Sequence, residues 1–163
     1  MEIRDASEAD LPEILAIRND VIATTTAIWT EEPATLEDVR GWFTSRTADG
    51  NPVIVAARGG EVLGFGSFGP FRAWPGYRFT AEHSVHVRAD ARGEGVGRAL
   101  VTELIARARA AGKHVLIAGV DTEGTASLGL HESLGFERVA WFREIGWKFG
   151  RRLDLVFLQL ILD

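Results

Sequence analysis

A glycine-rich turn past the middle of the chain is the segment best suited to binding a ligand. It reads Arg-Gly-Glu-Gly-Val-Gly-Arg over residues 92–98, between a segment with strand-like alternation and one with helical periodicity. Unpaired N–H groups at a helix start attract anions, and glycines let the backbone approach a bulky pyrophosphate. Arg92 and Arg98 add local positive charge. The turn indicates a phosphate site, although a tight connection that binds nothing explains the glycines equally well.

Two familiar nucleotide-binding motifs fit this turn less well. A P-loop requires a lysine and then Ser or Thr after its glycines, and no lysine follows here. A dinucleotide-binding fingerprint has the spacing Gly-x-Gly-x-x-Gly in the first βαβ unit, whereas Gly93, Gly95 and Gly97 give Gly-x-Gly-x-Gly past mid-chain. We therefore treat both as minor alternatives.

The composition fits one globular domain over residues 1–163. The chain has 46% apolar residues, no cysteine and a formal net charge of −5. Cysteine chemistry is therefore excluded, and the acidic charge disfavours nucleic acid as a partner. The four histidines lack the spacing of a helical metal site, so we expect no metal.

No apolar run approaches the ~20 residues that span a bilayer, and the first residues enter a strand-like segment, so we expect no membrane partner and a cytoplasmic location.

Hydrophobic periodicity divides the chain into strands and helices. We expect strands near Ile3, over 53–57, 62–68, 79–87 and 115–120 and in the tail, and helices over 10–23, 36–47, 126–134 and from the glycine turn to about 111. The strand over 79–87 has an unusual polar face that includes Glu82 and His86. This order indicates a mixed sheet covered by helices, an α/β (α+β) domain in three layers.

Three motifs in order resemble those of the GCN5-related N-acetyltransferase (GNAT) family. Arg92, Gly95 and Gly97 match its pyrophosphate-binding pattern Arg/Gln-x-x-Gly-x-Gly/Ala. The strand residues 84–87 and the segment Leu-His-Glu-Ser-Leu-Gly-Phe over 130–136 are similar to the neighbouring motifs, at the usual separation.

Further segments narrow the resemblance to the phosphinothricin and methionine sulfoximine acetyltransferase branch. They are residues 25–29, 76–85, 148–151 and 153–155, so the likeness spans nearly the whole chain. It implies a mixed, mostly antiparallel sheet of about six to seven strands flanked by about four helices. It also implies acetyl-CoA as co-substrate, a small-molecule amine as acceptor and no metal.

The resemblance also implies which residues contact the two substrates. The residues expected to bind acetyl-CoA are Val85, His86, Val87, Arg92, Gly93, Glu94, Gly95, Val96, Gly97, Arg98, Gly124, Ser127 and Ser133. The residues expected to meet the amine substrate are Trp29, Arg72, Ala73, Trp74, Glu82, His83 and Ser84. Three positions depart from the branch, which usually carries Asn at Gly124, Tyr at His86 and Trp at Arg152.

Glu82 and His131 are the expected catalytic residues. Acetyl transfer needs a neutral amine, and an amino group is mostly protonated at neutral pH, so Glu82 is our candidate general base. A carboxylate on an exposed sheet face, or one paired with Arg78, is the alternative. By the resemblance, a backbone N–H near Val87 stabilises the oxyanion and His131 protonates the leaving thiolate. A capping or core histidine explains His131 nearly as well.

The expected function is transfer of acetyl from acetyl-CoA to the amino group of a small amino-acid-like molecule, by direct attack in a ternary complex. Arg72 is a candidate guanidinium for a substrate carboxylate or phosphinate, Trp74 and Trp29 are candidate pocket walls, and Trp141 and Trp147 are assigned to core or dimer packing. The alternatives are a protein or peptide N-acetyltransferase and a noncatalytic CoA-binding regulatory module. The resemblance implies a homodimer, and a role in antimetabolite resistance stays open.

Overall fold

A mixed seven-stranded sheet runs through the centre of the fold. The computed structural model describes the whole chain, Met1 to Asp163, and orders the strands β1-β2-β3-β4-β5-β7-β6. The strands are β1 (Glu2–Asp5), β2 (Val53–Arg58), β3 (Glu61–Pro70), β4 (Thr80–Val87), β5 (Val115–Asp121), β6 (Glu137–Lys148) and β7 (Arg151–Ile161). Only β4 and β5 pair in parallel. The predicted mixed, mostly antiparallel sheet is confirmed.

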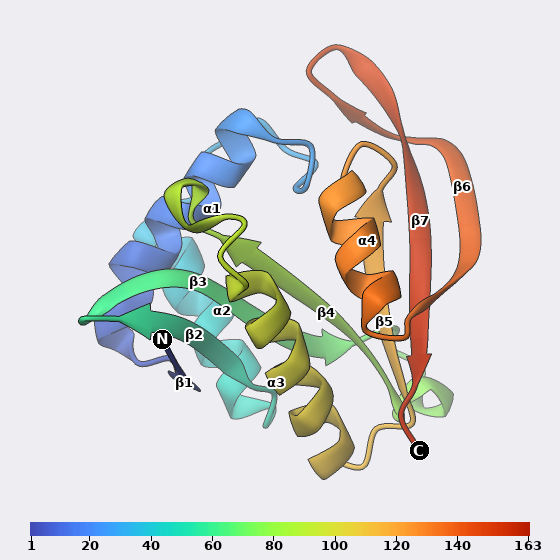
Figure 1. Cartoon of the computed structure of the whole chain (residues 1–163), viewed down its shortest axis with the longest axis horizontal. Helices are drawn as coiled ribbons and strands as arrows, with labels where there is room; N and C mark the ends of the chain where they lie inside the picture. The colour runs from blue at the N-terminus through green and yellow to red at the C-terminus, as the bar shows by residue number, and fades with distance from the viewer.

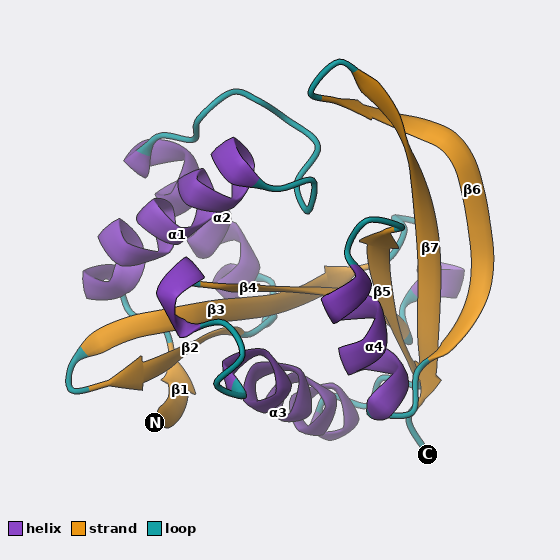
Figure 2. Ribbon diagram, turned by 45° about the horizontal axis from the view of Figure 1, so that its top comes forward, coloured by secondary structure: helices purple, strands orange, loops and turns teal.

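Four α-helices cover the two faces of this sheet. They are α1 (Leu11–Thr24), α2 (Leu36–Ala48), α3 (Val96–Ala110) and α4 (Thr125–Ser133), each within a residue of the predicted bounds. Figure 2 shows α1 and α2 on one face of β2, β3 and β4, with α3 on the other. Side chains alternate accordingly, since Ile54 and Ala56 of β2 join the core under α3 while Val55 joins the core under α1 and α2. No helix combines the length and apolarity needed to cross a membrane.

Strands β4 and β5 part halfway along their length. Residues 80–83 of β4 pair with 115–118 of β5, after which the two strands diverge, as Figure 1 shows. On its other side β4 stays paired with β3 as far as Val87. The β4 backbone groups that face β5 beyond His83 therefore have no strand partner, which leaves hydrogen-bonding capacity at the opening.

A buried lysine ties the β6–β7 hairpin to the end of α1. The Lys148 side chain is fully buried, and its Nζ donates to the carbonyl oxygens of Ile22 (2.6 Å), Thr25 (2.6 Å) and Ile28 (2.7 Å). The ring of Phe149 covers the ammonium at 4.6 Å. Phe149 and Gly150 form the two-residue turn between β6 and β7, and their φ values of +51° and +73° are those that a tight hairpin turn requires. Burial lowers the pKa of Lys148, while the three acceptors favour its charged form.

The same hairpin supports Trp29. Its indole lies against Gly146 of β6, where a Cβ atom would stand 2.6 Å from the ring carbon Cε3. Only glycine fits under the ring at this distance. Trp29 and Lys148 together fix the segment after α1 on the C-terminal hairpin.

Replacing Lys148 by Met should lower the free energy of unfolding by about 3 kcal/mol, because three carbonyl oxygens lose their charged donor. Urea unfolding followed by circular dichroism measures this. Lys113→Met is the matched control, since Lys113 is only half-buried and donates to one carbonyl oxygen, that of Arg78. If the two variants lost the same free energy of unfolding, the three hydrogen bonds of Lys148 would have no special role in stability.

Candidate active site

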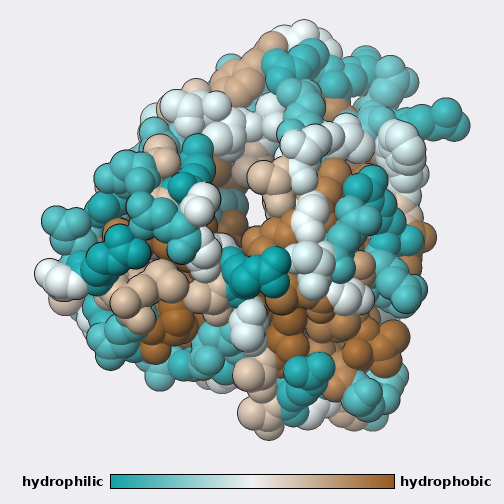
Figure 3. All heavy atoms as spheres, in the orientation of Figure 1, coloured by the Kyte–Doolittle hydropathy of each residue, from teal (hydrophilic) through white to brown (hydrophobic).

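Two pockets meet where β4 and β5 part. One, of about 460 Å³, opens toward α1 and α2; the other, of about 420 Å³, lies between the glycine turn and α4. Val85, Ser127 and His131 line both, so the two pockets adjoin at the opening. Figure 3 shows the surface hollowed near the centre of the molecule, between the α1 side and the α4 side. We call them the amine-side pocket, toward α1 and α2, and the turn-side pocket.

The glycine turn presents free amide groups to the turn-side pocket. Gly93 and Gly95 have φ of +80° and +85°, which glycine adopts without strain. The first amide with a helical partner is that of Ala99, which donates to the Gly95 carbonyl oxygen at 3.0 Å. The amides of residues 96–98 have no acceptor within the chain. Because the helix dipole adds positive potential there, the turn suits a phosphate group.

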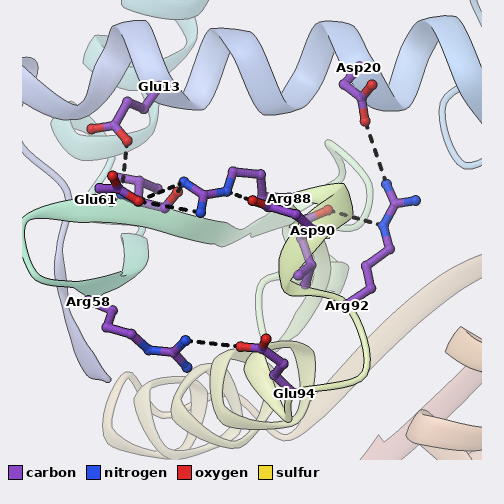
Figure 4. A network of polar contacts seen from close by, with 10 residues as sticks. Glu13, Asp20, Arg58, Glu61, Arg88, Asp90, Arg92 and Glu94 are labelled. Carbon is purple, nitrogen blue, oxygen red and sulfur yellow. Dashed lines mark hydrogen bonds and ion pairs between the residues drawn. The ribbon is translucent and has the colours of Figure 1, made fainter.

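Ion pairs anchor this turn to the rest of the protein (Figure 4). Arg92 reaches Asp20 of α1 at 3.8 Å, and Glu94 reaches Arg58 of β2 at 3.0 Å. Such exposed pairs each contribute about 1 kcal/mol or less, so they orient the turn more than they stabilise the fold. Glu94 consequently points to Arg58, and its side chain does not line the turn-side pocket.

Alternation along β4 separates the polar side chains onto the two faces of the sheet. His86 packs on Phe65 under α1 and α2, with ring centroids 5.5 Å apart, and Glu82 lies on this same face. His83 faces α4, where its Nε2 is 2.9 Å from Nε2 of His131. Glu82 and His131 therefore lie on opposite faces of the sheet, on either side of the opening.

The Glu82 carboxylate occupies space left by glycine. Its Oε2 would be 3.2 Å from a Cβ atom on Gly119, a residue that lines the amine-side pocket. Burial raises the pKa of Glu82, and the positive charges of Arg46 and Arg72 partly oppose that rise. No side chain of the protein forms a hydrogen bond or ion pair with it, and the alternative pairing with Arg78 is wrong. The Arg78 guanidinium turns to the Pro75 carbonyl oxygen instead, because a turn carries it away from the site.

The two histidines form a buried, neutral pair. His131 Nδ1 lies 2.7 Å from the Ser127 carbonyl oxygen, which only accepts, so Nδ1 carries the proton. His131 Nε2 then accepts from His83 Nε2. Burial lowers the pKa of both rings, that of His83 to about 3. In this arrangement His131 offers no unshared N–H to the pocket, and its role as proton donor stays a prediction.

The structure brings most of the predicted cofactor residues together. Those that line the turn-side pocket are Val85, Val87, Arg92, Gly93, Gly95, Val96, Gly97, Arg98 and Ser127. His86 and Gly124 line the amine-side pocket instead. Ser133 lies outside both walls and accepts a hydrogen bond from Arg98 Nη2 at 2.6 Å.

The predicted substrate residues are less concentrated. His83 and Ser84 line the amine-side pocket, whereas Trp29, Arg72, Ala73 and Trp74 do not. Glu82 is not part of the wall either, but its carboxylate lies against Gly119, which is. Trp74 is 76% exposed. Arg72 forms no hydrogen bond with Glu82 and affects the pKa of that carboxyl only through its positive charge. Trp141 and Trp147 are exposed on β6, so their assignment to the core of the monomer is wrong. Polar side chains of β7 contact them: the Arg152 guanidinium lies over the Trp147 ring at 5.7 Å, and Trp141 Nε1 donates to Asp154 at 2.9 Å.

Sequence reasoning missed several residues of the amine-side pocket. Arg18 of α1 and Arg46 of α2 line it, and so does Asp121 at the end of β5. Asp121 Oδ1 accepts hydrogen bonds of 2.9 Å from Thr26 Oγ1 and from the Glu123 amide, which joins the segment after α1 to the start of α4. No motif marks these positions, since they meet only through the packing of distant elements.

Comparison with known proteins agrees with this geometry. Residues 14–136 match the model of the acetyltransferase (GNAT) family. An L-methionine sulfoximine/L-methionine sulfone acetyltransferase of Pseudomonas aeruginosa is 52% identical over 162 residues, which cover 99% of this chain and 94% of the relative.

Solved structures share the fold at high similarity. A ribosomal-protein-alanine N-acetyltransferase from Brucella melitensis superposes with a TM-score of 0.98 at 50% identity, covering 99% of this chain and 100% of the other. A phosphinothricin acetyltransferase from Sinorhizobium meliloti, in complex with acetyl-CoA, superposes with a TM-score of 0.96 at 35% identity, covering 99% and 88%. The chain belongs to the GNAT family, and it is an acetyltransferase.

The buried histidine pair predicts loss of stability in mild acid. Between its unfolded pKa of 6.5 and its folded pKa of about 3, His83 is protonated only in the unfolded chain. The free energy of unfolding therefore falls as the pH falls through this window, by up to about 1.4 kcal/mol per pH unit from this residue. His83→Asn, whose amide can still donate to His131, should reduce the slope measured by urea unfolding from pH 6 to pH 5 by about that amount. An unchanged slope would contradict a neutral His83.

Proposed function

We propose that this protein transfers acetyl from acetyl-CoA to the amino group of a small amino-acid-like molecule. The observation that carries the proposal is the arrangement of two groups about one opening. An anion-binding turn lies on one side, and a carboxylate with a raised pKa lies on the other. The substrates in the name of the Pseudomonas aeruginosa relative are amino acids with short polar side chains, which suit a pocket of about 460 Å³.

The turn and strand β4 would bind acetyl-CoA, which supplies an activated acetyl thioester. The amides of residues 96–98 suit its pyrophosphate, and the β4 backbone over 85–87 has no strand partner toward the opening. The thioester then reaches the amine-side pocket between β4 and β5. A backbone N–H of β4 near Val87 is our candidate for stabilising the oxyanion.

Glu82 would accept a proton from the substrate ammonium, directly or through one water. The neutral amine attacks the thioester carbon and a C–N bond forms. The nitrogen then releases its second proton to water as the C–S bond breaks. The electron pair leaves on the sulfur of CoA, which then takes a proton on the α4 side. We assign that donation to His131 on that face; because its Nδ1 proton is bound to the Ser127 carbonyl oxygen and its Nε2 accepts from His83, the pair must first exchange its tautomers.

Two other functions fit the geometry less well. A protein N-acetyltransferase, the activity in the name of the Brucella melitensis structure, needs a groove for an extended chain. Here Ala27 and Ile28 wall the amine-side pocket, and Lys148 fixes their segment. A noncatalytic CoA-binding module would have no use for a half-buried carboxylate at the opening.

We also propose a homodimer that uses the outer face of the β6–β7 hairpin. Strand β6 is a sheet edge, and its Trp141, Ile145 and Trp147 are 65%, 54% and 58% exposed. An edge strand with large exposed apolar side chains is an expected interaction surface. The hairpin also supports the wall of the amine-side pocket, so dimer formation would stabilise the site.

Glu82→Gln should lower kcat at least about 100-fold at pH 7.5 and leave the Kd of acetyl-CoA unchanged, because a neutral amide cannot accept the proton. Thiol release is measured with L-methionine sulfone and with short peptides, and acetyl-CoA binding by calorimetry. In the wild type kcat/KM should fall as the pH falls through the raised pKa of Glu82.

The exposed Glu8 provides the control, and Glu8→Gln should behave as wild type. Full activity of Glu82→Gln would remove Glu82 as the base. Turnover of peptides with none of the amino acid would contradict the small substrate.

A further inference from the structure

Two arginines of the amine-side pocket form no ion pair or hydrogen bond with an acidic residue of the chain. Arg18 and Arg46 line this pocket from α1 and α2, and neither side chain forms an ion pair or a hydrogen bond within the protein. The Nε atom of Arg18 is buried without an acceptor, and Arg46 is half-buried. A guanidinium removed from water without a partner costs free energy, so such groups point to an anionic ligand.

Arg46 lies directly beside Glu82. Its guanidinium crosses Gly69 of β3, where a Cβ atom would stand 2.6 Å from Cζ, so only glycine leaves room for it. Gly69 is the cross-strand partner of Glu82, and the two residues share the face of the sheet under α1 and α2. The two charges do not form an ion pair with each other, which leaves each free for a substrate.

An α-amino acid substrate requires a carboxylate-binding group next to the general base. Its amine and its carboxylate are attached to the same carbon, so the group that binds the carboxylate must adjoin the base that deprotonates the amine. Arg18 does not meet this requirement, because it lies near His86, four residues and about 13 Å along β4 from Glu82. Arg72 is exposed on the loop before β4, where water weakens its attraction for an anion.

We propose that Arg46 binds the α-carboxylate of the amine substrate and thereby selects α-amino acids over amines that lack this group. The inference deepens the proposed function and rests on it. A planar guanidinium offers two parallel N–H donors to a carboxylate, and partial burial strengthens that contact. No predicted substrate residue supplies this contact from a buried position.

Kinetics with a matched pair of substrates test the proposal. L-methionine sulfone carries the α-carboxylate as its only anionic group, and L-methionine sulfone amide is the same molecule with that charge removed. For Arg46→Gln at pH 8.5, kcat/KM for the acid should fall about 30- to 100-fold against wild type, chiefly through KM. For the amide it should change less than threefold. Calorimetry should show the same loss of L-methionine sulfone affinity in the complex with CoA.

Two further variants define the specificity of this effect. Arg40→Gln, an exposed arginine on the same helix, should match wild type on both substrates. Arg46→Lys, which keeps the charge and loses the planar fork, should show a smaller loss confined to the acid, and it serves if Arg46→Gln does not fold.

The outcomes separate this inference from the proposed function. Equal losses on acid and amide would make Arg46 a residue that positions or tunes Glu82, and no loss on the acid would exclude any role for it; both overturn carboxylate binding. A wild-type enzyme that binds acetyl-CoA and acetylates neither compound would overturn the proposed function itself.

Discussion

The parting of β4 and β5 is the constraint on which the site depends. A parallel pair that stayed in register to the end of β4 would close the sheet and separate its two faces. Because pairing stops at His83 and Ala118, the faces communicate, and the β4 backbone beyond that point lacks hydrogen-bond partners on one side. The amide groups in the pantetheine arm of CoA can supply these hydrogen-bond partners. The same divergence brings the start of α3 and the side of α4 to one end of the opening.

The two faces at this opening differ in charge. On the α4 side, burial keeps His83 and His131 neutral, and the only strong attraction for an anion comes from the glycine turn and its arginines. On the α1 and α2 side lie an ionisable carboxylate and two unpaired guanidiniums. A protein with a net charge of −5 thus concentrates positive potential where two substrates that carry anionic groups would enter.

Local sequence signals predicted the elements and the turn, because these depend on neighbouring residues. Helix periodicity and glycine positions gave the bounds of α1 to α4 to within a residue, and the turn over 92–98 has the predicted form. The environment of Glu82 could not be predicted in this way. Gly69, Gly119 and Arg46 come from three elements far apart in the chain, and only the packed sheet shows that two glycines make room for two charges.

The C-terminal hairpin shows the same limit of local reasoning. Lys148 is the last residue of β6, beside the hairpin turn, and nothing nearby in sequence indicates that it binds three carbonyl oxygens at and after the end of α1. Trp141 and Trp147 are exposed, and composition alone does not reveal that the β6 strand which carries them is the edge of the sheet. Alternation alone did place Glu82 and His86 on one face, since period two is a local property.

A crystal structure with a bisubstrate analogue, in which CoA is joined through an acetyl bridge to the amine of L-methionine sulfone, tests the two-sided site most directly. The site predicts a pyrophosphate on residues 93–98, an arm that passes between β4 and β5, and a bridging nitrogen within hydrogen-bond reach of Glu82, about 3 Å. An analogue whose amine half lay on the α4 side, with Glu82 out of reach, would contradict it.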